Sequence, residues 1–244
     1  MRKQHDFNLA RVLLDKSQPA QAAPLLEELH RRFPKEAAVA IHLAHAYYAT
    51  GQLANCRQVV EQLLADEESE RPRARLYMGA LCFAEGKTDE ALDHLLAAEK
   101  TQPRLPGLHC QIGRIYLRKH LWSEAQRAFA KTLAIDPDSA KAHDGLASAL
   151  LGLHRYQEAA EEALLAVGLL HYFPHAHFHL GAALAKLGMN DRAILAFETC
   201  LAIQPGNLAA HQWLADLYGQ DPARLAQAIW HRHIVNSAGR SGPI

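Results

Sequence analysis

The sequence predicts an all-α protein, a right-handed superhelical solenoid of antiparallel helix hairpins with about fourteen helices. Alanine and leucine dominate the 244 residues while aromatic residues make up only 7%, a balance typical of packed helices rather than sheets. Positions suited to a turn recur every 34 or 35 residues, and small residues recur in step with them. A fixed period of about 20 to 50 residues indicates a repeat array, so we expect stacked helical hairpins.

The turns between hairpins follow one series of positions, four of which are proline: Pro34, Glu68, Pro103, Pro137, His171 and Pro205. Gly or Ala recurs in the first helix of each expected hairpin, at Ala10, Ala44, Gly79, Gly113, Ala147, Gly181 and Ala215. Twelve residues later small residues recur in the second helix, at Ala22, Cys56, Ala91, Ala125, Ala159 and Ala193, with Gln227 as the exception. Antiparallel helices approach closely only where side chains are small, so we expect these positions to be buried where the helices cross.

Large apolar residues accompany the small ones at helical spacing. In the second helices they lie four places after the small residue, for example at Leu95, Phe129 and Phe197. The two helices of a hairpin are joined by short turns in which Gly51, Gly86 or Gly188 supplies a helix C-terminus.

We expect one solenoid domain over residues 1–236. Its repeats are predicted at residues 3–36, 37–70, 72–105, 106–139, 140–173 and 174–207, followed by a capping hairpin over 208–236. Asp221 and Pro222 predict an N-cap and first helical position, so the last helix should run from about Pro222 to Asn236. Residues 237–244 contain two Gly and one Pro and are expected to form a flexible tail.

This pattern resembles the tetratricopeptide repeat (TPR), and the resemblance covers nearly the whole chain. The best copy spans residues 174–207, where the family's characteristic positions are matched by Leu180, Gly181, Leu184, Gly188, Ala193, Phe197, Cys200 and Pro205. Six consecutive copies at the same spacing make the resemblance specific, whereas a single copy would be weak evidence.

The resemblance implies that the first helix of each hairpin lines a concave ligand-binding groove. Carried onto this chain, it places in the groove Arg73, Tyr77, Arg114, Arg118, Lys141, His175, His179 and Lys186, with His42 and His45 nearer the N-terminus. The carboxylates among the groove positions are Asp15, Asp144 and Asp216. Such a groove favours an acidic peptide segment, a chain terminus or a phosphate-bearing group. The alternative is that these cations are only solvated surface charges, and the family's clamp for C-terminal carboxylates is not found.

Sixteen histidines are present, and four of them, His109, His143, His177 and His211, recur at intervals of 34 where the family usually has Trp. We interpret these four as a structural ladder that packs the first helix on its hairpin partner. His175 and His179 lie four residues apart and could both reach a metal, close to His171. Two ligands are not a site, so we expect no metal and no cofactor. Phosphate-loop, nucleophile-elbow and metalloprotease motifs are missing from the sequence, and no catalytic residue is predicted.

Composition restricts the partners. Lys plus Arg (26) equals Asp plus Glu (26), so no global field favours nucleic acid or an anionic membrane. No stretch approaches the roughly 18 apolar residues of a membrane helix, and the first residues do not resemble a signal peptide. Four scattered cysteines fit no zinc motif. We therefore expect a cytoplasmic protein that binds a protein or peptide partner.

Three segments, at residues 142–147, 166–174 and 176–181, are similar to a narrower group, the repeats that follow type I phosphodiesterase domains of the alkaline phosphatase superfamily. None of that family's catalytic metal motif is visible. The main hypothesis is a non-catalytic scaffold for protein interactions that binds an acidic or extended peptide. The alternatives are an accessory TPR module of a phosphodiesterase-type or other enzyme, which positions substrate or a catalytic domain, and an independent metal-dependent enzyme.

Overall fold

A computed structural model describes residues 2–65 and 71–240. This part of the chain holds fourteen α-helices and one 3-10 helix, with no strand among its residues. The all-α prediction of about fourteen helices is therefore confirmed. Glu68, one of the expected turn positions, and residues 241–244 of the expected tail lie outside the described residues.

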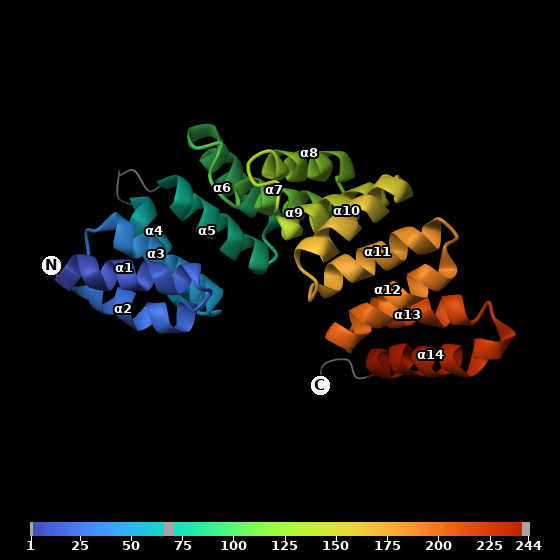
Figure 1. Ribbon diagram of the computed structural model, residues 1–244. Coiled ribbons are helices and arrows are strands. Elements are labelled where there is room, and N and C mark those ends of the chain that lie inside the picture. Colours follow the sequence, from blue (N-terminus) through green and yellow to red (C-terminus); the bar gives the residue numbers. More distant parts are fainter. Residues whose placement is uncertain (1, 66–70, 241–244) are drawn as a thin grey trace. The chain divides into compact units, whose positions relative to one another are not determined.

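The chain divides into two compact units, unit 1 (Met1–Ile115) and unit 2 (Tyr116–Ile244). Figure 1 labels the helices in chain order. Those of unit 1 are α1 (Arg2–Asp15), α2 (Pro19–Arg32), α3 (Ala37–Ala49), α4 (Leu53–Ala65), α5 (Arg71–Ala84) and α6 (Thr88–Thr101). The helix α7 (Leu108–Arg118) begins in unit 1, and its last turn belongs to unit 2.

Unit 2 continues with α8 (Trp122–Leu133), α9 (Ala140–Gly152), α10 (Tyr156–Leu169), α11 (Pro174–Lys186), α12 (Asn190–Ile203), α13 (Leu208–Tyr218), the 3-10 helix η1 (Pro222–Arg224) and α14 (Leu225–Arg240). The expected last helix from about Pro222 to Asn236 differs at both ends. It begins as the 3-10 turn, where the Asp221 carboxylate accepts a bond from the Ala223 amide at 2.9 Å. It then continues to Arg240, so the first half of the expected flexible tail is helical.

The helices of each unit form two layers. Helices adjacent in the chain pack on each other from α1 to α6 and from α8 to α14, as α1 does on α2 and α11 on α12. First helices of neighbouring hairpins also touch one another, in the series α1, α3 and α5 of unit 1 and between α9 and α11 of unit 2. The first helices therefore form one continuous layer in each of these stretches, and the second helices lie outside it.

The recurring small residues lie where the two helices of a hairpin cross. Ala44, Ala91, Ala147, Ala159 and Ala193 are fully buried. The large residue four places after the second small residue fills the space beside the first one. A Cβ on Gly79 would lie 2.7 Å from Leu95, and a Cβ on Gly181 would lie 2.8 Å from the Phe197 ring. The predicted pairing of small and large residues is confirmed at these two crossings.

In each of the first six hairpins, the turn between the two helices contains one residue in the left-handed region. Glycine fills it at Gly51, Gly86 and Gly188, as the sequence predicts, but other residues adopt the same conformation at Ser17, His120 and His154, with φ of 56°, 57° and 60°. These six positions are again 34 or 35 residues apart. The backbone path of the turn is thus kept even where the residue lacks glycine's freedom.

The histidine ladder ties each hairpin to the turn before it. The Nε2 atoms of His143, His177 and His211 lie 2.9 to 3.0 Å from the carbonyl oxygens of Pro137, His171 and Pro205, which occupy the recurring turn position six residues earlier. A carbonyl only accepts, so Nε2 donates. His143 Nδ1 also bonds Glu162 of its hairpin partner, at 2.6 Å. The predicted contact with the hairpin partner is thus confirmed for His143, whereas the bond to the preceding turn was not predicted.

His109 departs from the ladder. Its Nε2 lies 3.0 Å from Glu99 Oε1, and its buried Nδ1 has no hydrogen-bond partner among the described residues.

A second repeated link joins neighbouring hairpins. Tyr47 of α3 donates from its hydroxyl to Glu27 of α2 at 3.0 Å, and Tyr218 of α13 donates to Glu198 of α12 at 2.5 Å. Burial, and then the neighbouring carboxylate, raises the pKa of both tyrosines to about 12. Both hydroxyls therefore remain donors at neutral pH.

Replacing Gly181 by Ala should destabilise the protein by about 1 to 3 kcal/mol. The added methyl would collide with Phe197, whose ring is fully buried and stacks within 5.7 Å of Phe178 and Trp213, so the ring has no room to move. Gly168→Ala is the control, because a Cβ there meets nothing within 4 Å in the last turn of α10. Thermal melts should fall for Gly181→Ala and stay level or rise for the control. Equal melting temperatures would contradict the assigned crossing.

A buried histidine pair closes the last hairpin. His211 Nδ1 of α13 lies 2.7 Å from His231 Nδ1 of α14, and the two residues are 4% and 7% exposed. Because His211 donates from Nε2 to Pro205, its neutral ring accepts at Nδ1, and His231 donates. Burial, and then the neighbouring His211, lowers the pKa of His231 below its ordinary value of 6.5. The folded state therefore disfavours protonation of His231.

The free energy of unfolding should fall as the pH drops below about 6.5. At that pH His231 becomes protonated in the unfolded chain but stays neutral in the folded protein. The loss grows until the pH passes the lowered pKa of the folded state. Denaturant unfolding at about pH 7.5 and about pH 5.5 measures the difference. We expect His231→Gln to reduce this difference and His233→Gln, an exposed change on the same helix, to leave it unaltered. An unchanged difference in His231→Gln would show that the pair does not cause the acid sensitivity.

Candidate ligand-binding face

The residues assigned to the groove all lie on first helices. Arg73 and Tyr77 lie on α5, Arg114 and Arg118 on α7, Lys141 on α9, and His175, His179 and Lys186 on α11. The cations Arg73, Arg114, Arg118, Lys141 and Lys186 are exposed, as is His175, whereas Tyr77 and His179 are half-buried. Their role in binding stays a prediction, and the surroundings of each are described by unit.

Unit 1 contains a cavity of about 370 Å³ on its layer of first helices. Its lining residues come from α1, α3, α5 and the turn before α7: Asp15, Ile41, His42, His45, Arg73, Leu76, Tyr77, Leu105 and Pro106. Arg73 and Tyr77 are thus brought together with His42, His45 and Asp15, which the same resemblance places in the groove.

Aromatic rings form one wall of this cavity. Tyr77 stacks on His45 with ring centroids 6.1 Å apart, and Tyr48 lies at the same distance from Tyr77. Burial raises the pKa of Tyr77, and burial followed by repulsion from His42 lowers the pKa of His45. Both rings are therefore neutral at neutral pH, so the fixed charges around the cavity are the Arg73 guanidinium and the Asp15 carboxylate.

Arg114, also in unit 1, is held in place by its neighbours. Its Nη1 donates to Gln111 at 3.1 Å, and its guanidinium carbon lies 5.4 Å from the centre of the Phe83 ring. The ring faces the cation, and its π-electrons favour the positive charge. Arg118 lies one turn later on the same helix.

Unit 2 pairs some of the predicted groove cations. His179 Nδ1 lies 2.7 Å from Asp144 Oδ1, across α11 and α9, and these side chains are only 17% and 13% exposed. Lys186 Nζ lies 5.5 Å from the centre of the Trp213 ring on α13. Sequence reasoning left Trp213 and Phe83 out of the groove. Both are aromatic residues on first helices, and that signal could have identified them.

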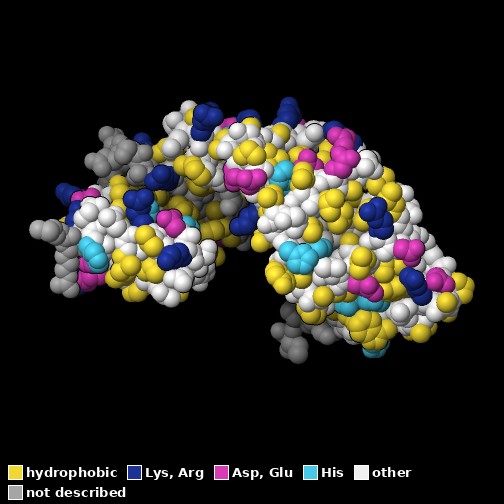
Figure 2. Space-filling view, viewed as in Figure 1, with side chains coloured by type: hydrophobic (Ala, Val, Ile, Leu, Met, Phe, Trp, Pro, Cys, Tyr) yellow, Lys and Arg dark blue, Asp and Glu magenta, His cyan; other side chains and the backbone are white. Residues whose placement is uncertain are grey.

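Charges of both signs are interspersed on the surface of each unit shown in Figure 2. That face carries no broad basic field, in keeping with the balanced composition. Any preference for an acidic ligand must therefore come from a few placed cations rather than from the overall charge.

No group of three or more metal-ligating side chains occurs among the described residues. His175 is exposed and packs beside Phe173, with ring centroids 5.9 Å apart, while His171 packs edge-on against His177. That no metal is bound at His171, His175 and His179 stays a prediction. None of the described helices is both long and apolar enough to span a membrane.

Stacked helix hairpins, with a cavity on the first helices of unit 1, define a helical-repeat protein. Three models of the tetratricopeptide repeat match the chain, over residues 13–71, over 174–207, and over 43–106 with 110–170. The last of these alone covers more than half of the residues. The chain therefore belongs to the tetratricopeptide repeat family. The matched models describe the repeat in general, so the narrower likeness to phosphodiesterase-associated repeats stays a prediction.

Two curated proteins are similar over part of the chain. Tetratricopeptide repeat protein 28 of Homo sapiens is 28% identical over 115 residues, which are 47% of this chain and 4% of that protein. The Hsp70-Hsp90 organizing protein of Triticum aestivum is 32% identical over 95 residues, which are 39% of this chain and 16% of that protein. The matches thus span only a small part of these relatives.

Solved structures share the fold at low identity. The Cut9-Hcn1 hetero-tetramer of the APC/C matches 93% of this chain and 45% of its own chain, with a TM-score of 0.80 and 16% identity. MamA matches 67% of this chain and 95% of its own, with a TM-score of 0.57 and 23% identity. YrrB, described as a TPR protein with an unusual peptide-binding site, matches 75% of this chain and 99% of its own, with a TM-score of 0.60 and 20% identity. These likenesses support the fold assignment alone.

Proposed function

We propose that this chain is a non-catalytic interaction module that binds an extended, acidic segment of a partner protein along its first helices. The observation that carries the proposal is the 370 Å³ cavity of unit 1, which is lined by three successive first helices and the turn before the fourth. A peptide crossing these helices would meet one hairpin after another, as expected for a linear ligand. YrrB, with its peptide-binding site, provides a precedent within the same fold.

The cavity offers complementary contacts to such a segment. The stacked rings of His45 and Tyr77 provide an apolar wall for a side chain of the ligand. Arg73 can donate two parallel hydrogen bonds to a carboxylate, and Asp15 can accept from a backbone amide. Beyond the cavity, Arg114 and Arg118 present two further cations four residues apart on α7.

Each exposed ion pair contributes less than about 1 kcal/mol, so affinity must come from several cations together. The acidic preference, the cytoplasmic compartment and the lack of catalysis are parts of this proposal. The partner we propose is a protein or peptide, and neither nucleic acid nor a membrane.

Changing Arg114 and Arg118 together to Glu should weaken binding of an acidic peptide about tenfold, because two attractions become repulsions. A labelled peptide of alternating Glu and Ala is titrated with the full chain, and fluorescence anisotropy gives the affinity. Peptides in which Lys or Gln replaces Glu define the charge preference. Binding of the Glu peptide should also weaken with added salt.

Arg127→Glu is the matched control, since Arg127 is also an exposed arginine but lies on a second helix, α8, where it pairs with Glu124. It should leave the affinity unchanged, and melting temperatures should agree among all three proteins. Equal affinity of wild type and double variant at low salt would refute the proposed acidic groove.

A further inference from the structure

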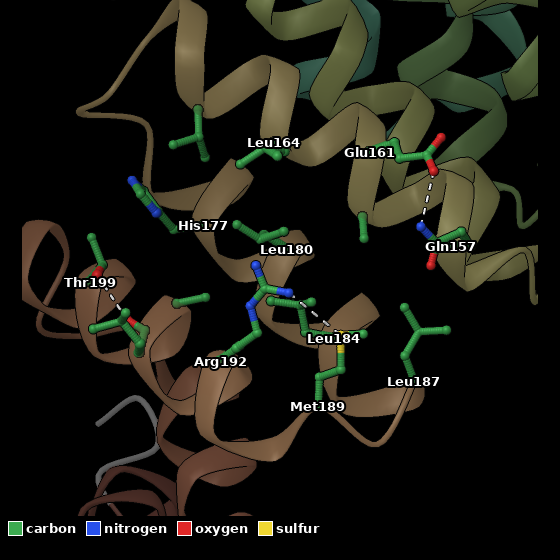
Figure 3. Close-up of a pocket in the computed structure, with 14 residues that line it drawn as sticks. Gln157, Glu161, Leu164, His177, Leu180, Leu184, Leu187, Met189, Arg192 and Thr199 are labelled. Carbon is green, nitrogen blue, oxygen red and sulfur yellow. Dashed lines mark hydrogen bonds between the residues drawn. The ribbon is translucent and has the colours of Figure 1, made fainter.

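Unit 2 has a second hollow, of about 380 Å³, on its layer of second helices. Its walls are α10 and α12, and its floor is α11, which contributes Leu180 and Leu184. Figure 3 shows Glu161 and Leu164 on the α10 wall, with Arg192 and Thr199 on the α12 wall. We call this hollow the outer groove. Its walls are second helices, whereas the face proposed above to bind peptide is made by first helices.

The walls of the outer groove carry leucines that are exposed to solvent instead of being buried in the core. Leu164 and Leu195 are 60% and 66% exposed, the highest values among the described leucines. Leu195 lies two places after the recurring small residue of its helix, Ala193. The same place is polar in four of the five preceding second helices, at Gln58, Asp93, Arg127 and Glu161, and the first of the five has Pro24. An apolar residue at this solvent-facing place breaks the pattern, and an exposed apolar groove is typical of a binding site.

One end of the outer groove carries opposite charges on its two walls. Glu161 accepts a hydrogen bond from Gln157 at 3.0 Å, and Arg192 lies 3.9 Å from the Met189 sulfur. No described carboxylate lies within ion-pair distance of Arg192. Figure 3 shows the Arg192 side chain extending over the groove beside Leu184 and Met189. Both charges are thus available to a ligand that brings its own acid and base.

We propose that the outer groove binds an amphipathic α-helix of a partner protein. The backbone groups of α10 and α12 are used inside the helices, so no strand edge is offered to an extended chain, and binding depends on burying side chains. A helix with apolar residues at i, i+4 and i+7 presents such a stripe to Leu164, Leu195 and the floor. Charge complementarity places an acidic residue of the partner at Arg192 and a basic residue at Glu161.

A displayed library of amphipathic helices tests this proposal. Leucine is fixed at i, i+4 and i+7, all other positions are randomised, and the library is sorted against the labelled full chain. We expect enriched helices that bind wild type at least about tenfold more tightly than Leu195→Glu, with an acidic residue at one end. Arg192→Glu should shift the preference at that end from acidic to basic. If no helix is enriched, the proposal is overturned.

Ile229→Glu is the matched control, because Ile229 is as exposed as Leu164 but lies on α14. It should keep full affinity, and equal losses in Leu195→Glu and Ile229→Glu would overturn the proposal. Leu195→Ser serves as a second variant if Leu195→Glu lowers the melting temperature. Sedimentation tests a competing occupant, since self-association of the wild type that Leu195→Glu abolishes would assign the groove to a second copy and overturn the partner helix. Arg114→Glu with Arg118→Glu should bind the enriched helices normally, which separates this site from the peptide-binding face.

Discussion

The close approach of the two helices in each hairpin is the constraint on which the rest of the structure depends. At Gly79 and Gly181 the neighbouring large residue already occupies the space that a Cβ would need. Contact at this distance fixes the crossing and places the turn at the same point of every copy. Within each unit first helices then stack on one another, as α1, α3 and α5 do in unit 1 and α9 and α11 do in unit 2. The proposed ligand-binding face therefore depends on small residues that are buried at the crossings and are not part of that face.

The sequence was sufficient for the crossings because steric fit restricts residue type at a fixed spacing. The sequence was insufficient for the turns. Glycine is the residue that predicts a left-handed conformation, whereas Ser17, His120 and His154 adopt it without being glycine. The bond from His143 to the Pro137 carbonyl was also missed, although both residues belong to recurring positions. Backbone acceptors have no residue signature, so only coordinates could identify this contact.

The binding surfaces were harder to predict because charge alone does not reveal pairing. The sequence places His179 and Asp144 on the same face, but it does not reveal that these residues, one repeat apart, are hydrogen-bonded to each other. The outer groove was missed for another reason. The family resemblance predicts binding residues on first helices, whereas Leu164 and Leu195 lie on second helices. A leucine in a helix is usually buried, so the sequence alone does not show that these two are exposed.

Arginine side chains provide the most direct test of the central claim, that acidic segments bind along the first helices. In two-dimensional NMR spectra each Nε–Hε group gives its own signal, which can be followed during titration with the acidic peptide. The account predicts shifts for Arg73, Arg114 and Arg118, and none for Arg127 or Arg192 on the second helices α8 and α12. Shifts confined to Arg127 and Arg192, with unmoved signals on α5 and α7, would contradict it.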